Sequence, residues 1–379
     1  MPELVAIDAA QGPALPGVLE RIWSHGDAAC VVDDRLDGAA RATQLAALAP
    51  TRRVGDDGDE ARWDGGVGVE PGDALVVATS GSTAAPRAVV LTHAAVAASA
   101  QATSARLGVD PSADRWLCCL PCAHVGGLSV VTRALLTGTP LEVHRRFDPD
   151  AVRDAATGGA TLVSLVAAAL RRVARPLAFR TIVLGGAAVP AAVPANVVAT
   201  WGLTETGSGV VYDGVALEGV DVAARDGELY VRGPMLARAY RDGTPIDAVG
   251  PDGTRGWLAT GDAGRVVGGI VEVFGRLADV INTGGEKVWP ADVERVLLTH
   301  PAVEEVAVWR RADAAWGERV VAWVVPRGAP PTLDELREHV ADALPRWAAP
   351  RELVVVASLP RTASGKVTRR ALDASAHPA

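Results

Sequence analysis

The sequence predicts an α/β protein, with a large N-terminal domain of α/β layers plus a β subdomain and a small α+β C-terminal domain. Between residue 71 and about residue 200, short apolar runs alternate with helical stretches rich in Ala, Leu and Val, as in domains with a largely parallel sheet. Residues 210–275 instead carry short strand-like segments between Gly, Asp and Pro turns, which indicates an antiparallel β subdomain. The last hundred residues combine strands with amphipathic helices in one compact unit.

Length and composition fit a folded, multidomain enzyme. The chain has 379 residues, 49% of them hydrophobic and 22% charged, enough for two or three domains with a large core. The net charge of −8 argues against general binding to nucleic acid or to an anionic membrane surface. No apolar run reaches ~18 residues, and the N-terminus has no basic-then-apolar signal pattern. We therefore expect a cytoplasmic protein with no nucleic-acid partner and no membrane insertion.

The cysteine pattern leaves two alternatives. Cys119-x-x-Cys122 invites a redox or metal interpretation, but no second Cys/His pair at zinc spacing follows it. Cys118 and Cys119 also lie in an apolar, strand-like run. We expect small core residues in a reducing compartment.

The elements of the N-terminal domain follow from local patterns. Residues 1–70 have weak periodicity and only short apolar pieces, and Asp56–Gly66 is expected to be a loop. Thr92 opens an Ala-rich helical stretch. Apolar runs predict strands at Ala74–Ala78, Trp116–Leu120, Thr181–Leu184 and Val197–Thr200.

Turn and cap signals define the rest of the chain. Pro290 suits the first turn of a helix, and Thr332 with Glu335 forms a capping-box pattern before a second helix that extends to Leu344. The expected strands are Glu228–Arg232, Gly269–Phe274, Val303–Trp309 and Val320–Val325. The β-rich section ends at Gly275–Asp279, which divides the chain into domains 1–276 and 277–379.

The most informative motif is Thr79–Arg87, which follows the strand at Ala74–Ala78. Gly81 permits close backbone approach, and hydroxyls and backbone N–H groups can donate to anionic oxygens, so the loop suits a polyphosphate. It is not a Walker A loop, because no Gly-Lys-Ser/Thr follows at the required spacing. Alone, it could equally be a flexible surface loop. Its candidate ligands are Thr79, Ser80, Gly81, Ser82, Thr83 and Arg87.

Two further motifs carry groups suited to a nucleotide. Trp201 offers a flat face to an adenine, and Gly202 removes a side chain that would obstruct it. Thr204 and Glu205 supply oxygen ligands for a hard cation such as Mg²⁺ or for a phosphate site. Asp262, in a Thr-Gly-Asp turn, can accept hydrogen bonds from both ribose hydroxyls. Each could instead be an ordinary turn residue.

The last motifs belong to the C-terminal third. Arg276 can bridge anionic oxygens bidentately, and Gly284-Gly285 allows a tight loop close to a ligand. Lys366 stands in a Ser-Gly-Lys turn near the end of the chain and can reach a polyphosphate as a point charge. Singly, a surface arginine, a plain glycine turn and a lysine in a frayed tail would be the better interpretations.

Together, and in this order, the five motifs resemble the adenylate-forming superfamily of acyl-CoA synthetases, luciferases and nonribosomal adenylation domains. The resemblance runs from about residue 70 to 370. It implies that Thr79–Arg87 is the phosphate loop and that adenine stacks near Trp201 and Gly202. It further implies that Thr204 and Glu205 attend the phosphates and Mg²⁺, that Asp262 holds the ribose, and that Arg276 helps to bind the nucleotide.

The same resemblance implies a mobile C-terminal domain with two tasks. Lys366 would contact the carboxylate and the α-phosphate during adenylation. Gly284, Gly285 and Lys287 would belong to the loop that lines the coenzyme A thiol tunnel in the second half-reaction. Because both tasks concern one site, the domain is expected to rotate about a hinge at Ala278.

Three positions depart from the usual pattern of the superfamily. Ala84-Ala85-Pro86-Arg87 replaces Gly-x-Pro-Lys, Trp201 stands where tyrosine is more frequent, and Ala278 replaces an often charged hinge residue. Arg87 keeps the positive charge, but as a planar fork.

Further segments are similar to those of bacterial o-succinylbenzoate–CoA ligases, in particular the short actinobacterial form. They are Leu120–Ser129, Leu184–Pro190 and Val211–Val215. On this resemblance His124, Gly126, Gly185 and Gly186 are expected beside the acyl substrate.

The implied reaction has two steps. An aromatic carboxylic acid attacks ATP to form an acyl-adenylate and pyrophosphate, and coenzyme A then displaces AMP, giving a product that would feed menaquinone synthesis. Mg²⁺ is the implied cofactor, with ATP and coenzyme A as co-substrates. The sequence does not fix the oligomeric state, and a homodimer is one alternative. The competing functions are an acyl-AMP ligase that loads a carrier protein, another aromatic acid–CoA ligase, and a relative that binds adenylate without turnover.

Overall fold

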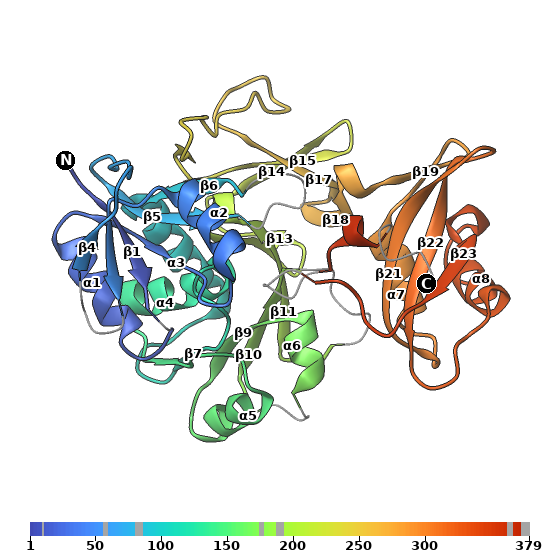
Figure 1. Ribbon diagram of the computed structural model, residues 1–379, viewed down its shortest axis with the longest axis horizontal. Helices are drawn as coiled ribbons and strands as arrows, with labels where there is room; N and C mark the ends of the chain where they lie inside the picture. The colour runs from blue at the N-terminus through green and yellow to red at the C-terminus, as the bar shows by residue number, and fades with distance from the viewer. Residues whose placement is uncertain are drawn as a thin grey trace.

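The computed structural model consists of a large body, coloured blue to yellow, and a smaller C-terminal body, coloured orange to red (Figure 1). It describes residues 1–9, 11–55, 60–79, 86–173, 178–186, 193–361 and 367–372. Within these ranges, no helix is both long and apolar enough to cross a membrane.

The first sheet is formed mainly by the N-terminal segment, where the sequence has only short apolar pieces. Its order is β16-β6-β5-β2-β1-β3-β4, with parallel pairing among β1, β2, β3 and β5 and antiparallel pairing at both edges. The periodicity of residues 1–70 is weak because strands buried on both faces show no alternation of apolar and polar residues. The loop expected at Asp56–Gly66 instead contains a short strand, Glu60–Arg62. The strands are β1 (Leu4–Asp8), β2 (Ala28–Val31), β3 (Arg52–Gly55), β4 (Glu60–Arg62), β5 (Asp73–Ala78), β6 (Ala88–Thr92) and β16 (Ala239–Tyr240).

The second sheet joins the α/β section and the β subdomain into one surface. Its order is β14-β15-β17-β18-β13-β12-β11-β10-β9-β7-β8. The strands are β7 (Trp116–Cys118), β8 (Leu141–Val143), β9 (Leu162–Val166), β10 (Thr181–Gly185), β11 (Val197–Leu203), β12 (Ser208–Tyr212), β13 (Val215–Ala216), β14 (Asp221–Arg225), β15 (Glu228–Arg232), β17 (Leu258–Val267) and β18 (Ile270–Arg276).

Strand β11 is the point where this second sheet changes from parallel to antiparallel. It pairs with β10 in parallel and with β12 in antiparallel orientation, with a register shift between Trp201 and Gly202. Ligands of open α/β sheets bind beyond the carboxyl ends of the parallel strands, and Trp201 lies near the carboxyl end of β11.

Helices fill the space between the sheets and cover their outer faces. The main core contains residues of α3 and α4 together with the facing strands β5, β6, β7 and β12. Helix α2 closes the outer face of the first sheet, and α5 and α6 close that of the second. Thr92 caps α3, as expected. The bounds are α1 (Leu15–Ser24), α2 (Gly38–Leu48), α3 (His93–Leu107), α4 (Val125–Thr137), α5 (Pro149–Thr157) and α6 (Ala167–Arg172).

The four cysteines lie in these hydrophobic cores. All four are free and buried. Cys118 Sγ lies 3.5 Å from Cys122 Sγ. No cluster of three or more metal-ligating His, Cys, Asp or Glu side chains occurs in the described ranges.

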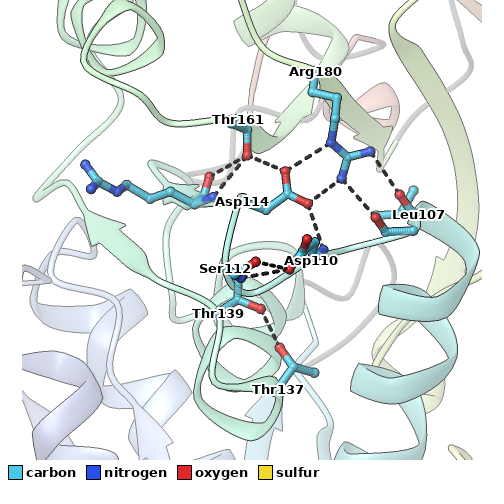
Figure 2. Close-up of polar contacts among 10 residues, drawn as sticks. Leu107, Asp110, Ser112, Asp114, Thr137, Thr139, Thr161 and Arg180 are labelled. Atoms are coloured by element: carbon cyan, nitrogen blue, oxygen red, sulfur yellow. Dashed lines mark hydrogen bonds and ion pairs between the residues drawn. The ribbon is translucent and has the colours of Figure 1, made fainter.

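A buried carboxylate ties α3 to the parallel part of the second sheet (Figure 2). Asp114 accepts from Arg180 Nη2 at 2.7 Å and Nε at 3.0 Å, and from the hydroxyl of Thr161 at 2.7 Å. Arg180 also donates to the carbonyl of Leu107, the last residue of α3, at 3.1 Å. Burial opposes ionisation of Asp114, but these donors outweigh it and hold its pKa below the usual value.

The C-terminal body has its own sheet and hydrophobic core. The strands are β19 (Ile281–Thr283), β20 (Glu286–Val288), β21 (Val303–Asp313), β22 (Gly317–Pro326) and β23 (Glu352–Val355), and the helices are α7 (Pro290–Leu297) and α8 (Leu333–Ala341). Val293, Val296 and Leu297 form the buried face of α7, and Thr332 with Glu335 makes the expected capping box of α8. Helix α8 ends before Leu344, which instead packs as a partly buried residue.

A short 3₁₀ turn, η2 (Leu277–Asp279), connects the two bodies. The apolar clusters of the large body end with Val271, and those of the C-terminal body begin with Ile281. Turn η2 itself contains no buried residue.

Candidate active site

Three of the predicted nucleotide residues meet at the carboxylate of Asp262. Its Oδ2 accepts the indole N–H of Trp201 at 2.7 Å, and its Oδ1 lies 2.9 Å from Nε of Arg276. Trp201 lies on β11, while Asp262 and Arg276 are directly paired on β17 and β18. Arg276 also donates through Nη1 to the carbonyl of Thr260 at 2.9 Å.

The local environment determines the pKa of Asp262 and how many further hydrogen bonds its carboxylate can accept. Only 6% of the residue is exposed, and this burial raises its pKa, whereas Arg276 and the Trp201 N–H favour the ionised form. Each carboxylate oxygen has two lone pairs, so donors in addition to Trp201 and Arg276 can still bind. The arrangement can therefore hold a pair of hydroxyl groups.

A second group of predicted residues lies around Tyr240 of β16. The Tyr240 hydroxyl donates to Glu205 Oε1 at 2.9 Å, and the Arg87 guanidinium carbon lies 3.4 Å from the centre of the Tyr240 ring. Thr79 and Arg87 close the loop between β5 and β6, because Thr79 N donates to the Arg87 carbonyl at 2.7 Å. Tyr240, which the sequence did not single out, thus connects the base of the expected phosphate loop to Glu205.

Glu205 has a free oxygen suited to a cation. Within the described ranges, Oε2 takes part in no hydrogen bond or ion pair, while Oε1 is bound by Tyr240. Thr204 and Glu205 form the start of η1 (Thr204–Thr206), which follows β11. A carboxylate oxygen and a hydroxyl in adjacent positions fit the oxygen preference of Mg²⁺.

Gly202 is required by the strand pairing itself. A Cβ at this position would overlap the carbonyl oxygen of Ser208 on β12. The absence of a side chain here therefore has a structural cause besides the space for an adenine that the sequence indicated.

Several expected site residues lie outside the described ranges. They are Ser80, Gly81, Ser82 and Thr83 of the phosphate loop, and Lys366.

The expected acyl residues occupy two positions around β7, α4 and β10. His124 precedes α4, with its Nε2 3.3 Å from Oδ2 of the buried Asp33, and Gly126 lies in the first turn of that helix. Gly185 is the last residue of β10, and Gly186 follows it. Burial tends to raise the pKa of Asp33, but His124 and Arg35 outweigh it and hold that pKa well below its usual range.

A buried arginine that the sequence analysis did not single out lies on α4. Arg133 is 2% exposed and donates through Nη2 to Ser208 Oγ at 3.1 Å. Its Nε and Nη1 make no hydrogen bond with any described residue. Burial lowers the pKa of this guanidinium.

Arg133 lines a small cavity. Its other walls include Val125, Ser129 and Thr132 of α4, and Gly207 after η1. The cavity measures about 10 Å³, roughly the space of one water molecule. A guanidinium with free donors in an apolar enclosure is suited to an anion such as a carboxylate.

The expected coenzyme A loop forms the turn of a β19–β20 hairpin. Gly284 and Gly285 both have positive φ, +61° and +89°, which suits a two-residue hairpin turn. A Cβ on Gly284 would overlap the ring of Trp316. Lys287 is exposed on β20. In the described part of the chain, no hydrogen bond or ion pair connects these residues with Trp201 or Asp262.

The expected hinge residue, Ala278, lies in the middle of η2. Its carbonyl accepts from Nη1 of Arg310 on β21 at 3.2 Å.

Comparison with known proteins identifies related chains over nearly the whole length. The model of the AMP-binding enzyme family matches residues 19–241, and that of the AMP-binding enzyme C-terminal domain matches residues 292–366. A probable 2-succinylbenzoate–CoA ligase of Mycobacterium tuberculosis is 38% identical over 381 aligned positions, covering 93% of each chain.

Solved structures agree with this similarity. The o-succinylbenzoate CoA synthetase of Bacillus subtilis, in complex with its acyl-adenylate intermediate, superimposes with a TM-score of 0.83 at 28% identity. That alignment covers 98% of this chain and 88% of the other. The same enzyme in complex with ATP and magnesium ion gives a TM-score of 0.84 at 27% identity, covering 98% and 89%.

Proposed function

This chain belongs to the AMP-binding enzyme family, and on that premise we propose that it is an ATP-dependent 2-succinylbenzoate–CoA ligase that works through an acyl-adenylate. The observation that carries the nucleotide half of the proposal is the meeting of Trp201, Asp262 and Arg276 at one carboxylate. Their motifs are far apart in the sequence, yet their side chains converge beyond the change in strand direction at β11.

In this proposal the ribose hydroxyls donate to Asp262, and Arg276 favours the ionised form of that carboxylate and orients it. The phosphates extend toward the base of the Thr79–Arg87 loop, where Arg87 supplies a positive charge. Glu205 and Thr204 would hold Mg²⁺, which offsets phosphate charge when bound. The remaining predicted phosphate ligands, Ser80 to Thr83, and the role of Lys366 stay predictions from the sequence.

The acid half of the proposal rests on Arg133. 2-Succinylbenzoate carries two carboxylates, and only one of them is activated. The free donors of Arg133 suit the other carboxylate, and the small cavity would be the innermost part of the acid site. His124, Gly126, Gly185 and Gly186 are proposed to border the aromatic part of the acid.

The chemistry then requires positioning and charge stabilisation rather than a protein nucleophile. The acid carboxylate attacks the α-phosphorus of ATP and pyrophosphate leaves. The thiol of coenzyme A next attacks the acyl carbon and AMP leaves. Because the ribose, the phosphates and the acid are held in fixed geometry, each attack becomes effectively unimolecular.

Further parts of the proposal concern the whole molecule. We propose residues 1–276 and 277–379 as the two domains, supported by the separation of their apolar clusters on either side of η2. A role in menaquinone synthesis, a cytoplasmic location and a homodimer stay predictions. Light scattering coupled to gel filtration measures the assembly directly.

The acid specificity can be tested with a matched pair of substrates. Pyrophosphate release is measured with 2-succinylbenzoate and with benzoate, for the wild type and for Arg133→Leu. We expect the wild type to prefer the dicarboxylic acid strongly and the variant to lose most of that preference. The proposed acid is wrong if the wild type activates both acids equally.

The thiol acceptor is tested separately. Coenzyme A and a phosphopantetheinyl carrier protein are offered to the wild type with preformed acyl-adenylate. Release of acyl-CoA supports the ligase, whereas transfer to the carrier alone supports an acyl-AMP ligase.

A further inference from the structure

Residues 367–372, which follow Lys366, are held against the C-terminal body. Arg361 and Val367 form an isolated antiparallel bridge, and Thr368 N donates to the carbonyl of Pro360 at 2.8 Å. Leu372 is 1% exposed and packs with Trp309 and other core residues. The described residues before position 362 and after position 366 are therefore held together by these contacts.

Arg369 adds a charged connection to this base. Its Nη2 lies 2.9 Å from Oε1 and 2.8 Å from Oε2 of Glu294 on α7. Its Nη1 lies 3.4 Å from Oδ2 of Asp279, the last residue of η2. The Arg369 side chain thus connects residues 367–372 both to α7 and to η2, the turn that joins the two bodies.

The partners of Arg369 are themselves well fixed. The Glu294 side chain is 15% exposed and also accepts the backbone N–H of Val308 at 2.8 Å. A second arginine holds the same turn, because Arg310 donates to the carbonyls of Ala278 and Val280, each at 3.2 Å. A largely buried carboxylate that accepts from both Arg369 and Val308 is costly to leave unpaired, so it specifies the position of Arg369 closely.

We propose that Arg369 is a positioning residue that fixes residues 367–372, the segment directly after Lys366, relative to η2 by bridging Glu294 and Asp279. This proposal rests on the proposed function, in which Lys366 acts only in the adenylation step. In this proposal Arg369 acts through the orientation of the lysine three residues before it and is assigned no contact with a substrate. Its loss should consequently impair adenylation and spare the second half-reaction.

The test uses the full-length chain with three substitutions. Arg369→Gln removes the charge and both carboxylate contacts, and Asp279→Asn weakens only the contact to the turn. Arg295→Gln is the matched control, since Arg295 is on the same helix as Glu294 but forms an exposed i,i+3 pair with Asp292. The measurements are pyrophosphate exchange, thioester formation from supplied acyl-adenylate, and hydrogen–deuterium exchange.

For Arg369→Gln we expect the adenylation rate to fall on the order of 30-fold, the scale of a lost charged hydrogen bond. Thioester formation should stay within about threefold of wild type, and backbone exchange should accelerate in residues 277–283 and 367–372. Asp279→Asn should show a smaller loss of the same kind, and Arg295→Gln none. Merely structural damage would slow both half-reactions alike.

Equal loss of both half-reactions in Arg369→Gln, or unchanged exchange in residues 277–283, overturns the proposal. A wild-type chain that exchanges no pyrophosphate with 2-succinylbenzoate instead contradicts the proposed function. In that case hydrogen–deuterium exchange still tests whether Arg369 holds residues 277–283 and 367–372 in place, because this measurement needs no substrate.

Discussion

Trp201 donates its indole N–H to Asp262 at 2.7 Å, joining two motifs that lie 61 residues apart in the sequence. The contact brings the expected adenine platform and the expected ribose acceptor to one point, and Arg276 completes it from the neighbouring strand. The indole N–H thereby gives the tryptophan a role in orienting the carboxylate besides offering a flat face.

Replacing Asp262 should weaken nucleotide binding specifically. For Asp262→Ala we expect the ATP KM and the Kd of AMP to rise by about 10- to 150-fold, because loss of a charged hydrogen-bond acceptor costs about 1.5–3 kcal/mol. Steady-state kinetics and AMP calorimetry measure both quantities. Asp252→Ala is the control, since Asp252 also accepts from an indole, Trp257 Nε1 at 3.0 Å, but lies outside the site. Unchanged ATP KM and AMP affinity in Asp262→Ala would remove this residue from the site.

The two lysines of the chain, Lys287 and Lys366, should act in different half-reactions. Lys366→Ala should abolish most pyrophosphate exchange and leave thioester formation from synthetic adenylate largely intact, because its charge is needed only while the α-phosphate is attacked. Lys287→Ala should show the opposite pattern. Comparable losses in both half-reactions for Lys366→Ala would contradict the assignment.

Restricting the turn between the two bodies should uncouple the half-reactions. In Ala278→Pro the ring fixes φ near −65° and disfavours the helical conformation of Leu277, which belongs to η2. We expect one half-reaction to slow far more than the other in a folded protein. Ala278→Gly, which adds freedom at the same position, should run both. A folded Ala278→Pro enzyme with wild-type rates in both steps would mean that the hinge lies elsewhere.

The Asp114–Arg180 contact should contribute to stability in a pH-dependent way. Arg180→Ala leaves the buried Asp114 carboxylate without its charged donor, and we expect the free energy of unfolding to fall by about 1–2 kcal/mol. Because the folded-state pKa of Asp114 is lowered, this contribution is full above its unfolded pKa and is lost as pH falls through the folded pKa. Denaturant melts at neutral and acid pH measure both effects, with the exposed Arg153→Ala as control. A variant with wild-type stability at neutral pH would contradict this account.

Local chain chemistry was sufficient to predict many elements of the fold. Turn residues bound strand β15, and the capping box of Thr332 and Glu335 indicates the start of α8. Strand β6 was not predicted, although Ala88–Leu91 carries the same apolar signal as β5, and its antiparallel pairing with β5 is a tertiary contact. The fusion of the parallel and antiparallel sections through β11 likewise depends on long-range pairing.

The site shows the same division. Trp201, Asp262 and Arg276 could be predicted as a set, but not that Asp262 would bind both of the others. Arg133 could have been found from the sequence, because it is the single charged residue of the apolar helical run Val125–Thr137. Charged residues are rarely buried unless they are paired, so such an arginine indicates a binding role. Tyr240 had none, because its contact with Glu205 depends on the packing of a two-residue strand.

The central claim is tested most directly by incubating the wild-type protein with 2-succinylbenzoate, ATP, Mg²⁺ and coenzyme A, and following the products by mass spectrometry. We predict 2-succinylbenzoyl-CoA and AMP in equal amounts, with the acyl-adenylate alone accumulating on the enzyme when coenzyme A is withheld. Absence of both the adenylate and the thioester, in a protein that still binds AMP, would contradict the account.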